Sequence, residues 1–410
     1  MKIALLSFEY PPETGYGGIG SYTWYHARAL VKLGHQVHVL AGANKSMQLK
    51  MNEHDGVQVF RFRSDGLLMR GFQKLERVRL WWTKNRLENA LSMFRAFQNL
   101  HQQHQYDVVE MPECGAEGFL INRFVRPNTF IKLHSPSQFI MPYYDVRGID
   151  ITLCSFLERT AIRGALAISA CSQFLAEEAR QKLGIQHPIR VIPNGIDLKL
   201  FDTSEQIDIH QRFNLPRKLP MILFSGRMER RKGIHLCKEI VTSILERFEV
   251  AFVFAGQDLF EYMTTILLPY WKNRKLKGSV HYLGKLEQNE VRSCLRQADI
   301  FLLPSLWENC PYSCLEAMAS SCAIVSSDQG GMPELIQDGE NGILARNEDP
   351  SSYVKCLEGL LEDRALRERL GDAARLTIER SYTDVHIARM TTEHYVECLN
   401  GRSIERQSVA

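Results

Sequence analysis

The chain of 410 residues lacks any long hydrophobic run. A membrane-spanning helix needs about 18 or more consecutive apolar residues, and no stretch approaches that length. The apolar N-terminal stretch MKIALLSFEYPP is interrupted by Glu9 and is too short for the hydrophobic region of a signal peptide. We therefore expect neither a spanning helix nor a signal peptide.

Cysteines with a metal-binding or redox spacing are also lacking. The ten cysteines include no C-x-x-C pair and no Cys/His pattern typical of a zinc site. Thiols scattered over a chain of this length are typical of a reducing compartment rather than of a disulfide framework. The sequence thus predicts a cytoplasmic protein, and it leaves peripheral contact with the inner face of a membrane open.

A strong net charge is lacking as well. The formal net charge is only +3 at pH 7, which by itself indicates no nucleic-acid partner. Residues 61–86 depart from this balance, because eight Lys and Arg stand against two acidic residues and alternate with aromatic and aliphatic side chains. Such a segment is typical either of contact with an anionic membrane or acceptor, or of a long helix with a solvated basic face and a buried tryptophan. The solvated helix is the more common of the two.

Short apolar runs alternate with helical patterns along the whole chain. In the first half we expect a helix at residues 22–33 and strands at residues 2–8, 36–40, 57–62, 107–110, 129–133, 165–170 and 189–192. In the second half we expect strands at residues 221–225, 250–255, 280–283, 300–303 and 323–326, followed by helices at 350–370 and 382–399. This alternation is typical of α/β domains whose parallel sheets are covered by helices on both faces.

A domain boundary is expected near residue 200, where Pro193, Asn194 and Gly195 give turn signals. The predicted domains are residues 1–198 and residues 199–381, followed by a final helix and tail at 382–410.

Ligands bind parallel sheets at the carboxyl ends of the strands, where the first half has two candidate features. The glycines in the loop after the first strand are Gly15, Gly17, Gly18 and Gly20. Glycine permits close approach to a ligand, but a lone glycine-rich turn is equally typical of a flexible loop, and no acidic residue completes a dinucleotide fingerprint. His134 directly follows the strand at 129–133, where a hydrogen-bonded core histidine is the more common interpretation.

In the second half, each expected strand also ends at candidate ligand residues. Arg227 follows the strand at 221–225, and Lys232 lies near the start of an expected helix in RMERRKGIHL. Leu283 and Gly284 end the strand at 280–283.

The strongest candidate pair is Glu308 and Glu316, which have seven residues between them. They lie on either side of a turn that leads from the strand at 300–303 into a helix, and Pro311 favours a helix start there. The N–H groups of a helix start suit an anion, and carboxylates suit sugar hydroxyls, so a ligand with phosphate and sugar is predicted. In isolation, a solvated loop carboxylate and a glutamate favoured by the helix dipole are the more common interpretation of the pair.

Five segments in this order resemble the retaining glycosyltransferases of family 4, which have the GT-B fold. They are PPETGYGGIG, IPNGID, FSGRMERRKGI, ADIFLLPSLWENCPYSCLEAMA and SSDQGGMPELIQDGENGIL. The resemblance covers nearly the whole chain. It implies two Rossmann-like domains that face each other across a cleft, with the last helix crossing back to the N-terminal domain. The nucleotide sugar would bind mainly on the second domain and the acceptor on the first.

The resemblance also implies roles for individual residues. Arg227 and Lys232 would bind the diphosphate, Glu308 the transferred sugar and Glu316 the ribose, while His134 would contact the sugar from the first domain. We expect the catalytic residues to be His134, Arg227, Lys232 and Glu308. The other expected donor-binding residues are Gly17 and Gly18 at the phosphate, Leu283 and Gly284 at the base, and Asn309, Cys310, Tyr312, Leu315 and Glu316 around the turn.

The chain departs from the family pattern near these residues. Asn309 replaces a usual glycine, and asparagine tolerates a positive φ better than most residues. Cys310 replaces a larger apolar residue beside the sugar. Arg230 and Arg231 add charge beside Lys232, and they either bind an acceptor phosphate or are solvated.

The predicted function is transfer of a hexosyl unit from a UDP- or GDP-sugar to an acceptor hydroxyl with retention of configuration. No metal or other cofactor is expected, because two cations can neutralise the diphosphate and no two aspartates lie two residues apart, so the D-x-D metal signature is absent. The sequence leaves the acceptor open between a glycan, a lipid-linked molecule and a small molecule. The expected pathway is the synthesis of a glycan, a glycolipid or a polysaccharide. Residues 61–86 and 135–146 are the expected acceptor-lining segments.

Two other functions stay open. One is a GT-B epimerase or hydrolase of nucleotide sugars, and the other is a non-catalytic nucleotide-sugar-binding protein. Nucleic acid is not an expected partner.

Overall fold

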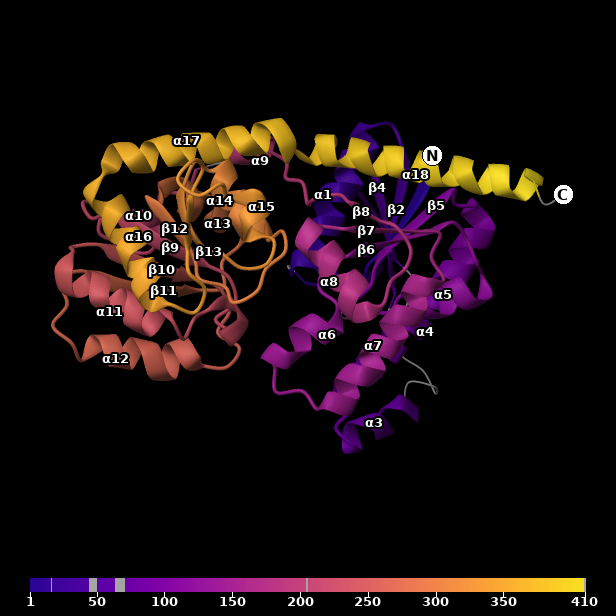
Figure 1. Cartoon of the computed structure of the whole chain (residues 1–410), viewed down its shortest axis with the longest axis horizontal. Helices are drawn as coiled ribbons and strands as arrows, with labels where there is room; N and C mark the ends of the chain where they lie inside the picture. The colour runs from indigo at the N-terminus through magenta and orange to yellow at the C-terminus, as the bar shows by residue number, and fades with distance from the viewer. Residues whose placement is uncertain (16, 44–49, 63–70, 204–205, 409–410) are drawn as a thin grey trace. The chain divides into compact units, whose positions relative to one another are not determined.

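The computed structural model describes residues 1–15, 17–43, 50–62, 71–203 and 206–408. The chain forms two compact units, each with its own parallel sheet (Figure 1). Unit 1 comprises Met1–Gly195 and Asp384–Ala410, and unit 2 comprises Ile196–Thr383. No helix of the described residues combines the length and the apolar character that crossing a membrane requires.

Unit 1 contains an eight-stranded sheet in the order β3-β4-β2-β1-β5-β6-β7-β8. Its strands are β1 (Lys2–Leu6), β2 (Gln36–Gly42), β3 (Lys50–His54), β4 (Val57–Phe62), β5 (Val108–Pro112), β6 (Thr129–Leu133), β7 (Ala167–Ala170) and β8 (Ile189–Val191). All neighbours are parallel except β3, which pairs antiparallel with β4 at one edge. The helices are α1 (Gly18–Lys32), α3 (Lys74–Arg77), α4 (Trp81–His104), α5 (Gly118–Phe124), α6 (Ser137–Ile140), η1 (Met141–Tyr143), α7 (Gly148–Arg163), α8 (Gln173–Leu183) and α18 (Asp384–Ser408).

Unit 2 contains a six-stranded parallel sheet in the order β11-β10-β9-β12-β13-β14. Its strands are β9 (Met221–Ser225), β10 (Ala251–Ala255), β11 (Ser279–Gly284), β12 (Ile300–Leu303), β13 (Ala323–Ser327) and β14 (Ile343–Ala345). The helical elements are α9 (Lys199–Asp202), α10 (Ile209–Arg212), η2 (Arg230–Lys232), α11 (Cys237–Arg247), η3 (Met263–Leu267), α12 (Leu268–Lys272), α13 (Gln288–Gln297), α14 (Tyr312–Ala319), α15 (Met332–Leu335), α16 (Pro350–Glu362) and α17 (Arg364–Ser381).

Parallel α/β architecture is confirmed in both halves, but some expected elements are wrong. Residues 350–370 form two helices, because Asp363 ends α16 and its side chain caps α17 by accepting from the N–H of Leu366 at 2.9 Å. An aspartate at this position satisfies a first-turn donor and starts a new helix direction.

The stretch at residues 61–86 is not one helix with a solvated basic face. Arg61 is buried and donates three hydrogen bonds to backbone carbonyls of β2 and of the loop after β1. Arg86 is also buried, with its Nε 3.0 Å from Glu158 Oε1. Among the described residues of the stretch, the helical ones are residues 71–72, the short α3 and the start of α4, and residues 63–70 lie outside the described residues. A buried guanidinium group needs hydrogen-bond partners, and Arg61 and Arg86, at the two ends of the stretch, have theirs in the interior of unit 1.

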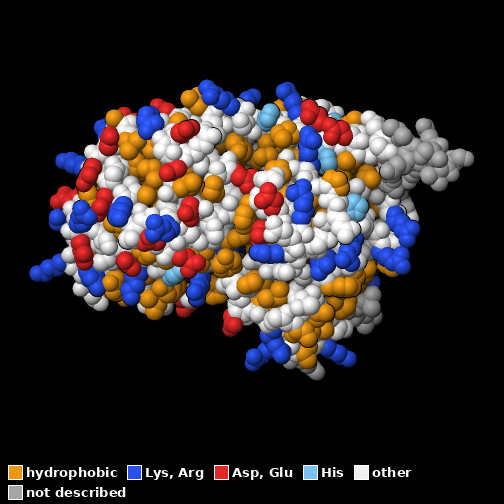
Figure 2. Space-filling model, viewed as in Figure 1, with side chains coloured by type: hydrophobic (Ala, Val, Ile, Leu, Met, Phe, Trp, Pro, Cys, Tyr) orange, Lys and Arg blue, Asp and Glu red, His pale blue; other side chains and the backbone are white. Residues whose placement is uncertain are grey.

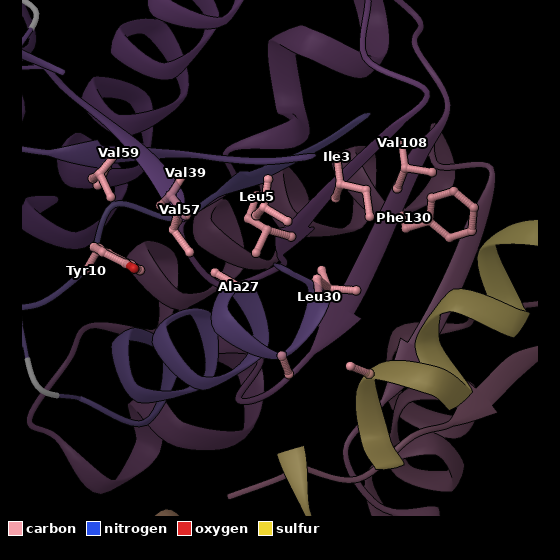
Figure 3. Packing of buried hydrophobic residues seen from close by; sticks show 14 of the residues in the cluster. Ile3, Leu5, Tyr10, Ala27, Leu30, Val39, Val57, Val59, Val108 and Phe130 are labelled. Atoms are coloured by element: carbon pink, nitrogen blue, oxygen red, sulfur yellow. The ribbon is translucent and has the colours of Figure 1, made fainter. Parts of the chain in front are cut away.

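The core of unit 1 lies between the sheet and the helices α1 and α18 (Figure 3). Ile3 and Leu5 of β1 pack with Val39 of β2 and with Leu30 of α1, and all four are buried. The last helix, α18, packs along α1 and adds Ala388 and Tyr395 to the same cluster. The C-terminal helix is therefore part of the folding unit that begins at Met1.

A buried carboxylate links three elements of this core. Glu110, on β5, accepts a hydrogen bond from the hydroxyl of Tyr22 in α1 at 2.7 Å and from the hydroxyl of Tyr395 in α18 at 2.6 Å. The carboxylate is only 3% exposed, so water cannot replace either donor.

Tyr395→Phe is expected to lower the free energy of unfolding by about 1–3 kcal/mol, because a buried carboxylate oxygen loses its donor. Denaturant titration measures the change. Val396→Ala, one position along α18 at a side chain that is 43% exposed, is the matched control and should change stability by less than about 0.5 kcal/mol. Equal stability of Tyr395→Phe and the wild type would contradict the importance of this link.

Candidate functional site

The order of strands in unit 2 determines where a ligand crevice forms. The chain runs outward from β9 to β10 and β11, then returns to β12 on the other side of β9 and continues to β13 and β14. Loops after β9 and β12 therefore leave the sheet at one edge and in opposite directions. Open parallel sheets bind their ligands at such a switch point.

Two glycines bring these loops together. Gly233 has a φ of +73°, and a Cβ there would lie 1.9 Å from the carbonyl oxygen of Pro304, so only glycine allows the loop after β9 to contact the loop after β12. Gly330, in the loop after β13, has a φ of +69°, and its Cβ would lie 2.0 Å from the carbonyl oxygen of Glu308. The next residue, Gly331, donates its N–H to that oxygen at 2.9 Å. The backbone of Glu308 is thus held from a neighbouring loop.

A chain of alternating charges crosses the switch point. The Arg227 guanidinium lies 3.2 Å from Glu229 Oε1, and the Arg231 guanidinium lies 3.1 Å from the same oxygen. Arg231 also lies 3.5 Å from Glu308 Oε1, to which Lys232 Nζ donates a hydrogen bond. Three cations and two carboxylates therefore form one network with a surplus positive charge. We call these five residues the charged chain.

Burial and neighbouring charges together determine the pKa values of Glu308 and Lys232. Burial raises the pKa of Glu308, but the cations of Lys232 and Arg231 outweigh it and hold that pKa below its ordinary value. The side chain of Glu308 is thus a carboxylate at neutral pH. Burial lowers the pKa of Lys232, and the carboxylate of Glu308 opposes the shift. Arg227 is different, because 48% of its side chain is exposed and can meet a ligand.

One expectation about this region is wrong, and two of the alternatives left open are excluded. Lys232 does not begin an α-helix, because η2 is a single 3-10 turn that ends at left-handed Gly233, and α11 begins at Cys237. Arg231 is not solvated, because its guanidinium is almost buried between two carboxylates. Glu308 is not a solvated loop carboxylate, since it is 6% exposed and ion-paired.

Helix α14 positions Glu316 on the other side of the turn. The helix begins directly after Pro311, as the sequence predicts. Glu316 is partly buried, and burial raises its pKa to about 7 although the Arg292 cation lowers it. Its carboxylate has no hydrogen-bond partner among the residues that the structure describes. A partly buried carboxyl group without a protein partner can accept a hydrogen bond from a ligand, so the site is suited to a ligand hydroxyl at this position.

The turn between Glu308 and α14 is compact. Asn309, Cys310 and Tyr312 are buried, and Asn309 is not among the described residues with a positive φ, so asparagine adopts this turn without strain. Leu315 is completely buried and its N–H donates to the carbonyl of Pro311, so its part in the donor site stays a prediction.

The residues expected at the base lie at the end of β11. Gly284 has a φ of +70°, and its carbonyl accepts the N–H of Gly256 at 2.7 Å. Two strand spacings separate β11 from β9, which is about 10 Å. Leu283 and Gly284 therefore lie at the carboxyl end of a strand in the same sheet whose loops carry the charged residues, and their part in binding the base stays a prediction.

His134 belongs to unit 1, directly after β6. Glu113, which is completely buried, accepts the N–H groups of His134 at 3.0 Å and of Ser135 at 2.6 Å. The ring of Tyr22 lies 4.7 Å from the imidazole ring. Burial lowers the pKa of His134 well below its usual range, so the imidazole is neutral and suited to hydrogen bonding. The approach of His134 to a donor sugar stays a prediction.

Gly17 and Gly18 lie at the start of α1, with Gly17 as the residue before the helix. They belong to unit 1, whereas the charged chain and Glu316 belong to unit 2. Among the described residues, no group of three or more His, Cys, Asp or Glu side chains is arranged to hold a metal ion.

Sequence reasoning missed Glu229 and Glu113. Glu229 lies inside the RMERRKGIHL segment, where its place between two arginines was the available signal. Glu113 directly follows β5, so the rule that picked out His134 after β6 applies to it equally.

Two family models match the chain. The model described as glycosyltransferase family 4 matches residues 16–200, and the model described as glycosyl transferases group 1 matches residues 205–377. An uncharacterized glycosyltransferase of Methanocaldococcus jannaschii is 25% identical over 96% of this chain and 98% of its own length.

Solved structures share the fold. Sucrose-phosphate synthase of Thermosynechococcus elongatus has a TM-score of 0.79 and 19% identity, over 98% of this chain and 99% of that one. HepE of Anabaena, in complex with UDP-glucose, has a TM-score of 0.74 and 18% identity, over 97% of this chain and 100% of that one. The likeness confirms the expected GT-B fold.

Glu316→Gln is expected to change how stability depends on pH. The folded pKa of Glu316, about 7, is raised above the ordinary value of 4.5, so its contribution to stability is fully present below pH 4.5 and is lost as pH rises through 7. The wild type should therefore lose up to about 3 kcal/mol relative to Glu316→Gln over this range.

Thermal unfolding of both proteins at several pH values measures this difference. Glu340→Gln, at an exposed position of the same unit, is the matched control and should run parallel to the wild type. A pH-independent difference between Glu316→Gln and the wild type would show that Glu316 titrates normally.

Proposed function

The chain belongs to the glycosyltransferases of family 4 and group 1, and on this basis we propose that it transfers a hexosyl unit from a nucleotide diphosphate sugar to an acceptor hydroxyl with retention of configuration. The observation that carries the proposal is the charged chain at the switch point of unit 2. It presents a surplus positive charge at the crevice where a ligand of this fold binds.

Lys232 and Arg227 would bind the diphosphate. The ammonium group of Lys232 has three N–H donors, and the hydrogen bond to Glu308 uses one of them. The remaining donors can reach phosphate oxygens, together with the half-exposed guanidinium of Arg227. These charges stabilise the leaving diphosphate because they are held in place before the reaction by buried carboxylates.

Glu308 would bind hydroxyls of the transferred sugar rather than act as an acid. Its pKa is lowered by two cations, so it carries no proton to donate at neutral pH. Glu316 would bind the ribose, because its carboxyl group needs a hydroxyl partner. The two glutamates are therefore not the acid and base of a glycosidase. Attack from the front face, with the leaving phosphate taking the acceptor proton, fits a site that supplies positioning and charge.

UDP- or GDP-sugars are the proposed donors, and the UDP-glucose complex of the HepE protein of the same fold supports the first. The proposed location is the cytoplasm, with peripheral contact to the inner membrane face. A glycan, a lipid-linked molecule or a small molecule would be the acceptor, in glycan, glycolipid or polysaccharide synthesis.

A nucleotide-sugar epimerase or hydrolase and a non-catalytic binding protein are the alternatives. Release of nucleotide from a panel of UDP-, GDP- and ADP-sugars, followed with and without acceptors, distinguishes the proposed transferase from each alternative. A transferase releases nucleotide faster with acceptor, a hydrolase releases it equally in both, and an epimerase or a binding protein releases none.

Lys232→Ala and Arg227→Ala are each expected to lower the rate of transfer by about 100-fold or more, because each removes a preorganised cation from the leaving group. Glu308→Ala should also lower the rate strongly. The assay follows nucleotide release from the donor that the panel identifies. Lys218→Ala, which removes an exposed cation just before the amino end of β9, is the matched control and should keep full activity. Normal turnover by Lys232→Ala would reject the site.

Transfer is expected to continue in excess EDTA, since Arg227 and Lys232 provide the charge that a divalent ion would supply in a metal-dependent enzyme. Activity after EDTA treatment is compared with activity after adding Mg²⁺ or Mn²⁺. Loss of transfer in EDTA and its recovery with a metal would contradict metal independence.

A further inference from the structure

We propose that one end of unit 1 docks on an anionic lipid bilayer and that the acceptor is lipid-linked. The docking surface comprises α3, the start of α4 and the start of α7, and its exposed residues are Lys74, Val78, Arg79, Trp81, Arg147 and Ile149. The statement about the acceptor rests on the proposed function, whereas the docking does not.

Apolar side chains are exposed together on this surface. Val78 is 53% exposed, Trp81 49% and Ile149 56%. Phe156, 59% exposed, lies seven residues after Ile149 and therefore on the same face of α7 two turns further along. Soluble proteins rarely leave large side chains of this kind exposed in one cluster unless the cluster binds something.

Hydrogen bonds show that the residues are neighbours. Arg147 donates to the carbonyl of Val78 at 3.0 Å, which joins the loop before α7 to the end of α3. Asp150, completely buried in α7, accepts the N–H groups of Trp82 at 3.1 Å and of Thr83 at 2.8 Å. Asp150 thus joins the start of α7 to the start of α4, and Ile149 and Trp81 each directly precede a residue of this contact.

The charges around the cluster favour one occupant. Lys74, Arg79 and Arg147 are exposed beside the apolar residues. Glu76 is paired with Lys84 at 2.6 Å, and among the described residues Asp145 is the other exposed carboxylate close to this surface in the sequence. Figure 2 shows hydrophobic side chains over this end of unit 1 with Lys and Arg around them. A tryptophan and aliphatic side chains flanked by cations are typical of a bilayer interface with anionic lipids.

This surface replaces the broader segment at residues 61–86 that the sequence indicates. Arg61 and Arg86, at the two ends of that segment, are buried and engaged, so they cannot contact lipid. Arg147 and Ile149, which come from a later part of the chain, complete the surface instead.

A lipid-linked acceptor follows from docking. A water-soluble acceptor reaches the enzyme by diffusion and needs no bilayer contact. An acceptor anchored in the bilayer presents its hydroxyl only at the membrane surface, where a docked enzyme meets it at high local concentration.

Sedimentation with vesicles tests the docking. The full chain should bind vesicles of phosphatidylglycerol and phosphatidylcholine, bind pure phosphatidylcholine weakly, and dissociate as salt rises from about 0.1 M to about 0.5 M. Trp81→Ser combined with Ile149→Ser should weaken binding at least about tenfold, because two side chains lose their burial in lipid. Lys74→Gln combined with Arg79→Gln should weaken binding to the anionic vesicles only.

Phe260→Ser is the matched control, since Phe260 in unit 2 is 64% exposed and lies outside the docking surface. Its binding should equal that of the wild type. Absent or salt-independent binding of the wild type, or unchanged binding of both double variants, would overturn the docking. A dimer that the double variant Trp81→Ser, Ile149→Ser dissociates without a change in vesicle binding would overturn it too, because the surface would then join two copies.

The acceptor is tested with the same variants. Transfer to a lipid fraction in vesicles should fall in Trp81→Ser combined with Ile149→Ser, while thermal stabilisation by the donor stays that of the wild type. Equal transfer to lipid by variant and wild type would overturn the lipid-linked acceptor. Failure of every nucleotide sugar to stabilise the wild type would instead count against the proposed function, and vesicle binding would still decide the docking.

Discussion

The ion pair between Lys232 and Glu308 is the interaction on which the site of unit 2 depends. Each of these two charges needs the other, because a buried charge without a partner costs on the order of several kcal/mol of stability. Their pairing requires the loops after β9 and β12 to approach closely, and glycine at position 233 permits that approach. Strand order, backbone conformation and charge are therefore satisfied together at one point of the sheet.

Much of the fold is predictable because buried parallel strands are runs of mostly apolar residues. The strands Val57–Phe62, Thr129–Leu133, Met221–Ser225 and Ile300–Leu303 have the bounds that the sequence predicts. Two strands at sheet edges were not predicted. β3 has the polar sequence KMNEH and owes its conformation to pairing with β4, and β14 is only three residues long. Pairing with a neighbour, rather than local pattern, determines such strands.

The candidate site is predictable in its positions but not in its partners. The residues after each strand were identified because the carboxyl ends of parallel strands meet at one edge. That Arg231 would be buried between Glu229 and Glu308 depends on a turn whose direction is set by Gly233 and by its contact with Pro304. Likewise, Arg61 and Arg86 appear in the sequence as members of a basic run, and only long-range packing shows that they face the interior.

The chain leaves unit 1 after Gly195 and returns to it at Asp384, and this order affects folding during synthesis. Ile196 begins unit 2 and forms a bridge with Thr383, which ends it, so unit 2 is an insertion whose ends lie side by side. All of its residues have been synthesised before the first residue of α18. Unit 1 receives Tyr395, one of the two tyrosine donors to its buried Glu110, only with that last helix. The unit that begins the protein is therefore the second to be completed.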